Sequence, residues 1–317
     1  MVEFANHWVN CSRTLALPGV DSGISSRKTE SYDSGTVSGP LVIKLIGRQD
    51  MRQRHGPWGL LGLICAGTIA MPLYALELDG VREIRMETEG RLHVSQGSEA
   101  SVVANRKVVT FERRGDTLLI RSAEAAPEAQ VDEPTDLQIS VVVANLNALV
   151  STSDAHLTVD RFEVDELNLT LAGHGGINVN NVVADEVNIS LAGHGSVSVD
   201  NLRAENVDAR LRGHGSVQID GLDTGSLAVH ISGHGSVEVS GSARTQMLDV
   251  HGQGDYFADD LQSDVATVAI RGRGRAHLWV RSALTVDEMQ EGTVRYRGAP
   301  VLHYLGADQH DAGSTLL

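Results

Sequence analysis

The tripeptide Gly-His-Gly recurs along this chain at a fixed interval. Its copies begin at residues 173, 193, 213 and 233, a 20-residue period, and Gly252-Gln253-Gly254 and Gly272-Arg273-Gly274 continue the series. A unit of this length cannot bury a core by itself, so successive units must stack on one another. Six copies of one short unit therefore predict a solenoid.

Apolar residues alternate with polar ones around each tripeptide. Val187, Ile189 and Leu191 precede one copy, and Val197 and Val199 follow it. A period of two places one face of a strand in a core and the other in solvent. We therefore predict an all-β solenoid with about 20 residues per coil, in which two or three short strands of each coil pair in parallel with those of its neighbours.

A second turn is expected eight residues after the first glycine of each tripeptide. Asn181, Asn201, Gly221 and Gly241 stand at this position. Asparagine and glycine tolerate a left-handed backbone better than other residues do. We place a tight turn there in each of these coils.

Coils are also expected on both sides of the tripeptides. Upstream, 149–159 fits the frame, with Ser153-Asp154-Ala155 in the tripeptide position, and 81–87 with 91–94 form a first coil. Downstream, 294–300 forms a closing coil. The aromatic and proline residues near this end would cap an otherwise open sheet edge; they are Tyr296, Pro300 and Tyr304.

The N-terminal region has the features of an export signal. Basic residues follow Met51, an uncharged stretch runs from Trp58 to Leu76, and Ala70 and Ala75 offer small residues for cleavage. We expect a signal peptide at 51–75, behind a segment 1–50 that is disordered or precedes the true start. Alternatively, the uncharged stretch stays as a single membrane anchor. In both cases the body lies outside the cytoplasm, in the periplasm or at the cell surface.

These boundaries leave one β-helix domain at 76–305. Residues 76–122 form its N-terminal coils, 123–135 an acidic surface loop, and 136–305 the glycine-turn repeats with a C-terminal cap, before a flexible tail at 306–317. From residue 76 onward there are 36 Asp and Glu against 19 Lys and Arg. This anionic surface repels nucleic acid and acidic lipid, so membrane contact is expected only through the signal or anchor segment. The arginines at 271, 273 and 275 are read as solvated turn residues.

Several motifs together resemble one bacterial family. They are the opening strand 81–86, the segment 92–97, the strand 117–121, the glycine-turn coils, and the ending Arg297-Gly298-Ala299-Pro300. Over nearly all of residues 78–305 they are similar to the exported family called "Putative auto-transporter adhesin, head GIN domain". The resemblance implies a right-handed parallel β-helix and supplies no catalytic residue. This chain departs from it in carrying Gly-His-Gly where the family's turns tend to carry Gly-Ser-Gly.

The histidines of the four tripeptides are the candidate site. They are His174, His194, His214 and His234. Stacked coils would align them about 4.8 Å apart. Neighbouring imidazoles at that spacing could share a zinc, copper or nickel ion; the alternative is a row of solvated turn side chains. The serines that follow two residues later have no organised oxyanion donors, which acyl transfer requires.

We therefore expect an exported, adhesin-like binding or structural solenoid of the bacterial cell envelope, with no catalysis and no cofactor. Its partner would be an envelope or extracellular protein, or a glycan. The alternative is a carbohydrate-active β-helix enzyme, similar to a polysaccharide lyase. Its candidate acids are scattered along the repeats: Asp200, Glu205, Asp220, Asp223 and Glu238. A groove that gathers acids and arginines would favour this alternative.

Overall fold

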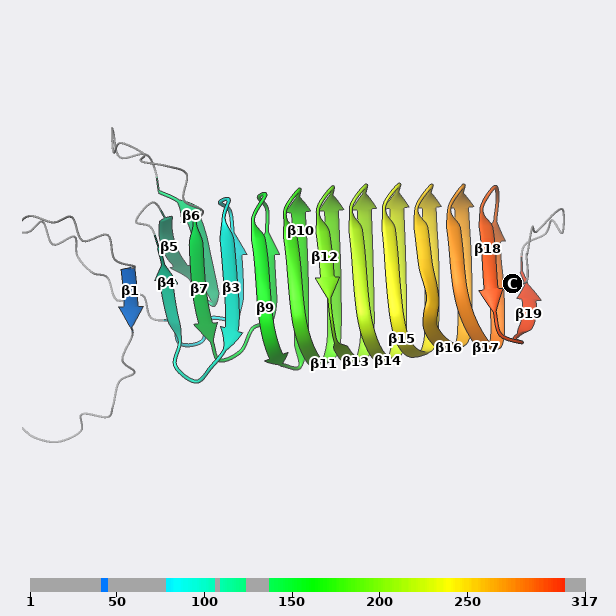
Figure 1. Cartoon of the computed structure of the whole chain (residues 1–317), viewed down its shortest axis with the longest axis horizontal. Helices are drawn as coiled ribbons and strands as arrows, with labels where there is room; N and C mark the ends of the chain where they lie inside the picture. Colours follow the sequence, from blue (N-terminus) through cyan, green and yellow to red (C-terminus); the bar gives the residue numbers. More distant parts are fainter. Residues whose placement is uncertain (1–40, 45–77, 106–108, 124–136, 306–317) are drawn as a thin grey trace, which may run out of the picture. The chain divides into compact units, whose positions relative to one another are not determined.

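The computed structural model describes residues 41–44, 78–105, 109–123 and 137–305. All regular secondary structure within these ranges is β-strand. About eight coils stack as a parallel β-solenoid (Figure 1). The predicted all-β solenoid is confirmed. The predicted signal peptide at 51–75, nearly all of the acidic loop and the tail lie outside the described residues. Among the residues described, no helix is long and apolar enough to cross a membrane.

The repeated part of the stack keeps the register that the tripeptides predict. Leu191 pairs with Leu211, and Leu211 with Ile231, each step being one 20-residue coil. The longer strands bend around the corners of a coil, where the pairing skips a residue and then resumes. The strands of this part of the stack are β8 (Ala148–Ser151), β9 (His156–Glu163), β10 (Glu166–Gly173), β11 (Gly176–Gly193), β12 (Ser196–Val199), β13 (Leu202–Gly213), β14 (Ser216–Gly233), β15 (Ser236–Gly252), β16 (Asp255–Gly272) and β17 (Arg275–Met289).

Small and medium aliphatic side chains fill the interior of the coils. In one coil the inward residues are all at most 5% exposed: Val197, Val199, Leu202, Ala204, Val207, Ala209 and Leu211. Each stacks on an equivalent residue above and below, because the strands pair in register. Burial of aliphatic surface is therefore spread evenly along the stack, as expected of a solenoid.

The coil between Gly233 and Gly252 is one residue shorter than the three Gly-His-Gly coils before it, and the predicted position of Gly241 in it is off by one residue. Only 19 residues separate Gly233 from Gly252, so Gly241 pairs with Leu222 and not with Gly221. The register shifts between Ile219 and Leu222, at a corner of the coil. A residue can be lost at a corner because the strand pairing is already interrupted there.

This shorter coil contains a buried polar network. Gln246 aligns with Leu227 at an inward position and is 4% exposed. The Tyr256 hydroxyl donates a hydrogen bond to Gln246 Oε1 (3.0 Å), and Gln246 Nε2 donates to Ser263 Oγ (2.6 Å). Ser263 Oγ in turn donates to the Trp279 carbonyl (3.0 Å). Each of these buried groups is satisfied, so the network specifies the packing of the coil without an unpaired group.

The Tyr256→Phe variant should lose less free energy of unfolding at alkaline pH than the native chain does. Burial raises the pKa of the Tyr256 hydroxyl above its ordinary value. Above about pH 10 the unfolded chain loses this proton while the folded chain keeps it, so the free energy of unfolding falls by up to about 1.4 kcal/mol per pH unit from this group. Urea unfolding of both proteins across neutral and alkaline pH measures the difference. Parallel pH profiles in the two proteins would contradict the burial of this hydroxyl.

The N-terminal coils stack in an order that differs from their order in the chain. Strands β2 (Glu83–Met86) and β3 (Arg91–Gln96) pair on one side with β8 and β9. On the other side they pair with β6 (Thr117–Ser122) and β7 (Gln138–Val143). The first coil of the chain is therefore the second in space, and the segment that follows it forms the outer layer.

Both ends of the stack carry strands that depart from the regular coil. At the N-terminal end, antiparallel pairings of β5 (Val109–Arg114) with β6, of β4 (Ser101–Ala104) with β7, and of β1 (Leu41–Lys44) with β4 extend the outer layer. At the C-terminal end β18 (Thr293–Arg297) and β19 (Val301–Tyr304) continue β17, as the predicted closing coil requires. Tyr296 packs against the core, whereas Tyr304 is 46% exposed and does not cap it.

Candidate functional site

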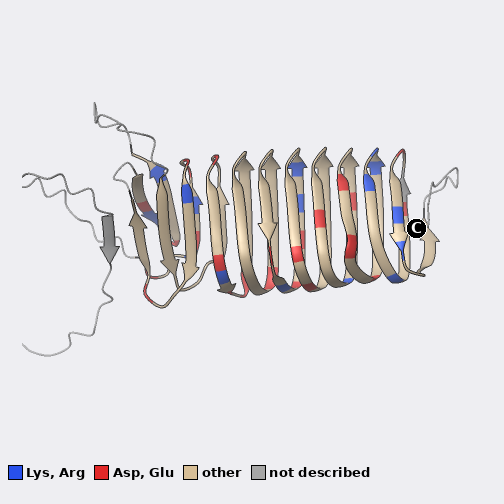
Figure 2. Cartoon of the chain, viewed as in Figure 1, with Lys and Arg blue, Asp and Glu red and all other residues tan. Residues whose placement is uncertain are grey.

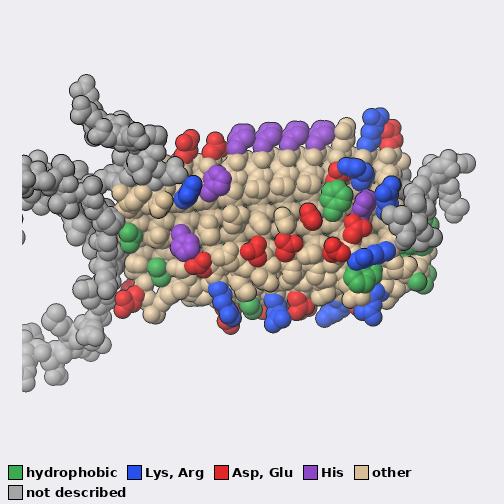
Figure 3. Space-filling model, viewed as in Figure 1, with side chains coloured by type: hydrophobic (Ala, Val, Ile, Leu, Met, Phe, Trp, Pro, Cys, Tyr) green, Lys and Arg blue, Asp and Glu red, His purple; other side chains and the backbone are tan. Residues whose placement is uncertain are grey.

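The four tripeptide histidines form a continuous stack along one edge of the solenoid (Figure 3). Between successive rings, from His174 to His234, the centroids lie 5.1, 5.0 and 4.9 Å apart. The ring planes differ by only 5°, 2° and 4°. The predicted alignment is confirmed, and all four side chains are exposed.

The backbone beneath the rings sets this alignment. The N–H groups of the three later histidines each donate to the carbonyl of the glycine that opens the preceding tripeptide, as His214 does to Gly193 at 2.9 Å. Gly213 has φ +115°, a backbone conformation that residues with a Cβ rarely adopt. A Cβ on it would lie 2.5 Å from the Gly193 oxygen. The glycines thus let successive tips approach closely enough for the rings to stack.

Charged and polar side chains extend the histidine stack at both ends. We call this line of turn positions the tip row: Glu89, Asp154, His174, His194, His214, His234, Gln253, Arg273 and Glu291. At its N-terminal end, Asp154 Oδ1 lies 3.4 Å from His174 Nδ1 and accepts the His174 N–H at 3.2 Å. At its C-terminal end, Arg273 Nε lies 2.6 Å from Glu291 Oε2. The row runs from two carboxylates through four imidazoles to an ion pair.

The rings do not form a preassembled metal centre. Parallel planes direct the in-plane nitrogen lone pairs side by side, and a shared ion needs them to converge. In the ranges that the structure describes, no three His, Cys, Asp or Glu side chains gather around one point. Any ion on the tip row would therefore be held by two protein ligands at first.

The backbone beside the tip serines and the arginines near the tips have partners within the solenoid. The N–H groups of His214 and Ser216 donate to the preceding coil, so they are occupied and cannot serve as oxyanion donors. The arginines are ion-paired and are not simply solvated: Arg271 pairs with Asp249, Arg273 with Glu291, and Arg275 with Asp255. Charges of both signs lie close together on these C-terminal coils (Figure 2).

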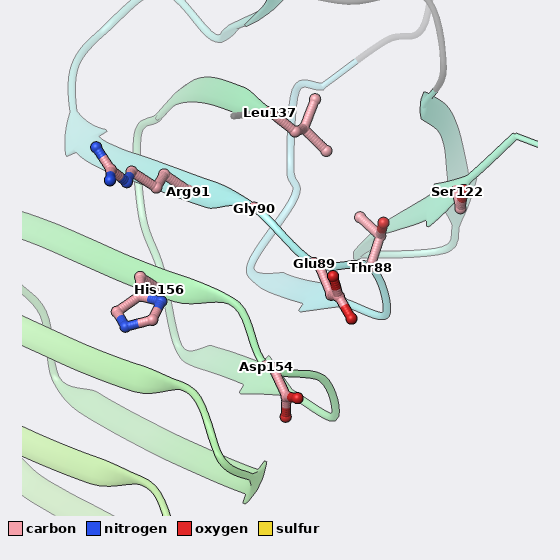
Figure 4. A pocket seen from close by; sticks show the side chains of 8 residues that line it. All are labelled: Thr88, Glu89, Gly90, Arg91, Ser122, Leu137, Asp154 and His156. Carbon is pink, nitrogen blue, oxygen red and sulfur yellow. The ribbon is translucent and has the colours of Figure 1, made fainter. Parts of the chain in front are cut away.

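An open pocket of about 480 Å³ lies at the N-terminal end of the tip row (Figure 4). Glu89 and Asp154 lie on neighbouring coils in its lining, and Arg91 pairs in register with His156 beside them. Sequence reasoning missed this group because Glu89 and Asp154 are 65 residues apart. The sequence did contain one signal for this group, since Asp154 occupies the position that histidine takes in the later tripeptides. Of the acids named from sequence, Asp223 pairs with Arg203, and Asp220 accepts hydrogen bonds from the side chains of Gln218 and Ser240.

Comparison with known families now places the chain. Residues 81–239 and 188–300 match the family described as "Putative auto-transporter adhesin, head GIN domain". The chain belongs to this family. The two matched stretches together span the described coils from β2 to the start of the C-terminal cap, so the head GIN domain and the solenoid are the same unit.

Solved structures share the fold of this head GIN domain. A putative lipid binding protein from Parabacteroides distasonis is 16% identical, with a TM-score of 0.52 over 73% of this chain and 93% of that chain. A putative adhesin from the same species is 18% identical, with a TM-score of 0.52 over 71% and 88%. At such identities the likeness concerns the fold alone. No curated protein matches this chain significantly.

Proposed function

We propose that this head GIN domain is an exported component of the bacterial cell envelope that binds an extracellular or envelope partner through its solenoid surface, in the manner of an adhesin. The observation that carries the proposal is the unbroken stack from β2 to β17, whose equivalent side chains repeat about every 5 Å along one edge. Membership of a family named for an auto-transporter adhesin supports the same role. The export signal expected at 51–75 supplies the route.

A rigid surface of this kind suits an extended partner. Each coil is held to the next by backbone hydrogen bonds, so the side chains of the edge are already ordered before binding. Little conformational entropy is then lost on association, and many weak contacts can add up. A polymer with a short regular repeat, such as a glycan, would meet the same side chain at successive positions. The excess of acidic residues disfavours nucleic acid as a partner.

A carbohydrate-active enzyme is the second candidate, and one observation favours it. The pocket in Figure 4 brings Glu89 and Asp154 together beside Arg91 and His156. Paired carboxylates next to basic groups are the kind of residues that glycan cleavage uses. The pocket is open, however, and binding a glycan there would also serve an adhesin.

Incubation of the purified chain with an array of bacterial and host glycans and matrix proteins separates these roles. We expect saturable binding to a small set of them, with the bound polymer recovered at its original length. As a matched test, Glu89→Gln with Asp154→Asn should leave that length unchanged. Shortened products that appear with the native chain and vanish with the double variant would establish the enzyme instead. An absence of binding to any class would contradict the adhesin role.

A further inference from the structure

The N-terminal end of the tip row already has the spacing of a metal site. Two nitrogen or oxygen ligands at about 2.1 Å from a tetrahedral zinc ion lie roughly 3.4 Å from each other. Asp154 Oδ1 and His174 Nδ1 are 3.4 Å apart, on neighbouring coils. Elsewhere on the row, neighbouring rings are about 5 Å apart. There, each ring must lean about 0.8 Å toward its neighbour before two nitrogens can share an ion.

We propose that the tip row binds a divalent transition-metal ion of the zinc class. It binds first between Asp154 and His174, and more weakly between the later histidines. Imidazole with carboxylate is a ligand pair that suits zinc. Both side chains are well exposed, 68% for His174 and 58% for Asp154, so an ion reaches them without opening the fold and keeps water as its other ligands.

Two further features support the order of binding. The His174 N–H holds the Asp154 carboxylate in place at 3.2 Å, which orients the ligand as outer-shell hydrogen bonds do in metal sites. Glu89 stands on the next coil and adds negative charge at this end. At the opposite end the row continues with neutral Gln253 and with Arg273, whose positive charge repels a cation although it is paired with Glu291.

The acidic body favours cations near the row in general. From residue 76 onward, acidic side chains outnumber basic ones by 36 to 19, so the field of the domain concentrates divalent ions at its surface. This attraction acts on every exposed histidine. The control is therefore an exposed histidine of the same domain that does not belong to the histidine stack. His303 on β19 is exposed and lies outside the tip row.

Zinc titration of the untagged chain by calorimetry tests the site. We expect a tighter event that Asp154→Asn and His174→Gln each weaken by about tenfold or more, the loss seen even when a residue that only supports a ligand is removed. His214→Ser with His234→Ser should remove weaker binding and leave the tighter event unchanged, and His303→Ser should change neither. Imidazole NMR signals from His174 should shift at the lowest zinc concentrations.

Circular dichroism and thermal melting of each variant verify that the exposed substitutions leave the fold intact. Two results would overturn the proposal. One is zinc affinity that stays the same in Asp154→Asn and in His174→Gln. The other is a loss in His303→Ser as large as the loss in the tip-row variants, which would mean that zinc responds to the charge of the domain and not to the row.

Discussion

Leu211→Asp should prevent the solenoid from folding. Leu211 is 1% exposed and lies between Leu191 and Ile231 of the neighbouring coils, so the new carboxylate would have only aliphatic side chains around it. An unpaired buried charge costs several kcal/mol, about as much as the whole stability of many domains. Because an interior coil contacts both neighbours, the damage would extend to two interfaces.

Thermal and urea unfolding, followed by circular dichroism, measure this effect. Val199→Asp, at another inward position of the same coil, should behave in the same way. His214→Ser is the matched control, since its side chain is exposed at the tip three residues from Leu211. We expect it to change the free energy of unfolding by less than about 0.5 kcal/mol. A His214→Ser variant as unstable as Leu211→Asp would refute the assignment of inward and outward positions.

Gly213→Val should destabilise the fold by about 3 kcal/mol or more, combining backbone strain with a disturbed hydrogen bond. The backbone at this residue has φ +115°, and an added Cβ would lie 2.5 Å from the Gly193 oxygen. That oxygen accepts the His214 N–H, so it cannot move away without disturbing the pairing of the tips. The added side chain would thus clash with the Gly193 backbone, which its hydrogen bond to the next coil holds in place.

Gly115→Val provides the comparison for this experiment. Gly115 also has a positive φ, +66°, but nothing lies within 4 Å of an added Cβ. Its substitution should cost only the strain of the left-handed conformation, about 1–2 kcal/mol. Denaturant unfolding of both variants isolates the steric part. Equal losses in the two would mean that the tips are not packed against each other.

Much of the fold follows from the spacing of a few residue types. The Gly-His-Gly period and the alternation of aliphatic residues predict the coil length, the inward positions and the alignment of the histidines. These predictions succeed because identical units stack in the same register, and a slip by one residue would turn every inward side chain outward. Local sequence is then sufficient, since each coil meets only its neighbours.

The exceptions occur where the repeat is broken. The 19-residue coil places Gln246 at an inward position, and its network with Tyr256 and Ser263 satisfies it. A period counted from glycines alone does not reveal such a network, because hydrogen bonds between three coils depend on which side chains meet in the interior. Gly241 has a positive φ (+123°), as the turn prediction requires, but it aligns with Leu222 and not with Gly221, because this coil has lost one residue.

The sequence by itself determined the solenoid, its coil length and the row of four histidines, because these depend on contacts between units one period apart. Only the tertiary structure decided that the coil of β2 and β3 lies against β8 and β9 with β6 and β7 outside it. That order depends on pairing between strands separated by tens of residues, which no local pattern specifies. It is this pairing that brings Glu89 next to Asp154 and gives the tip row its acidic end.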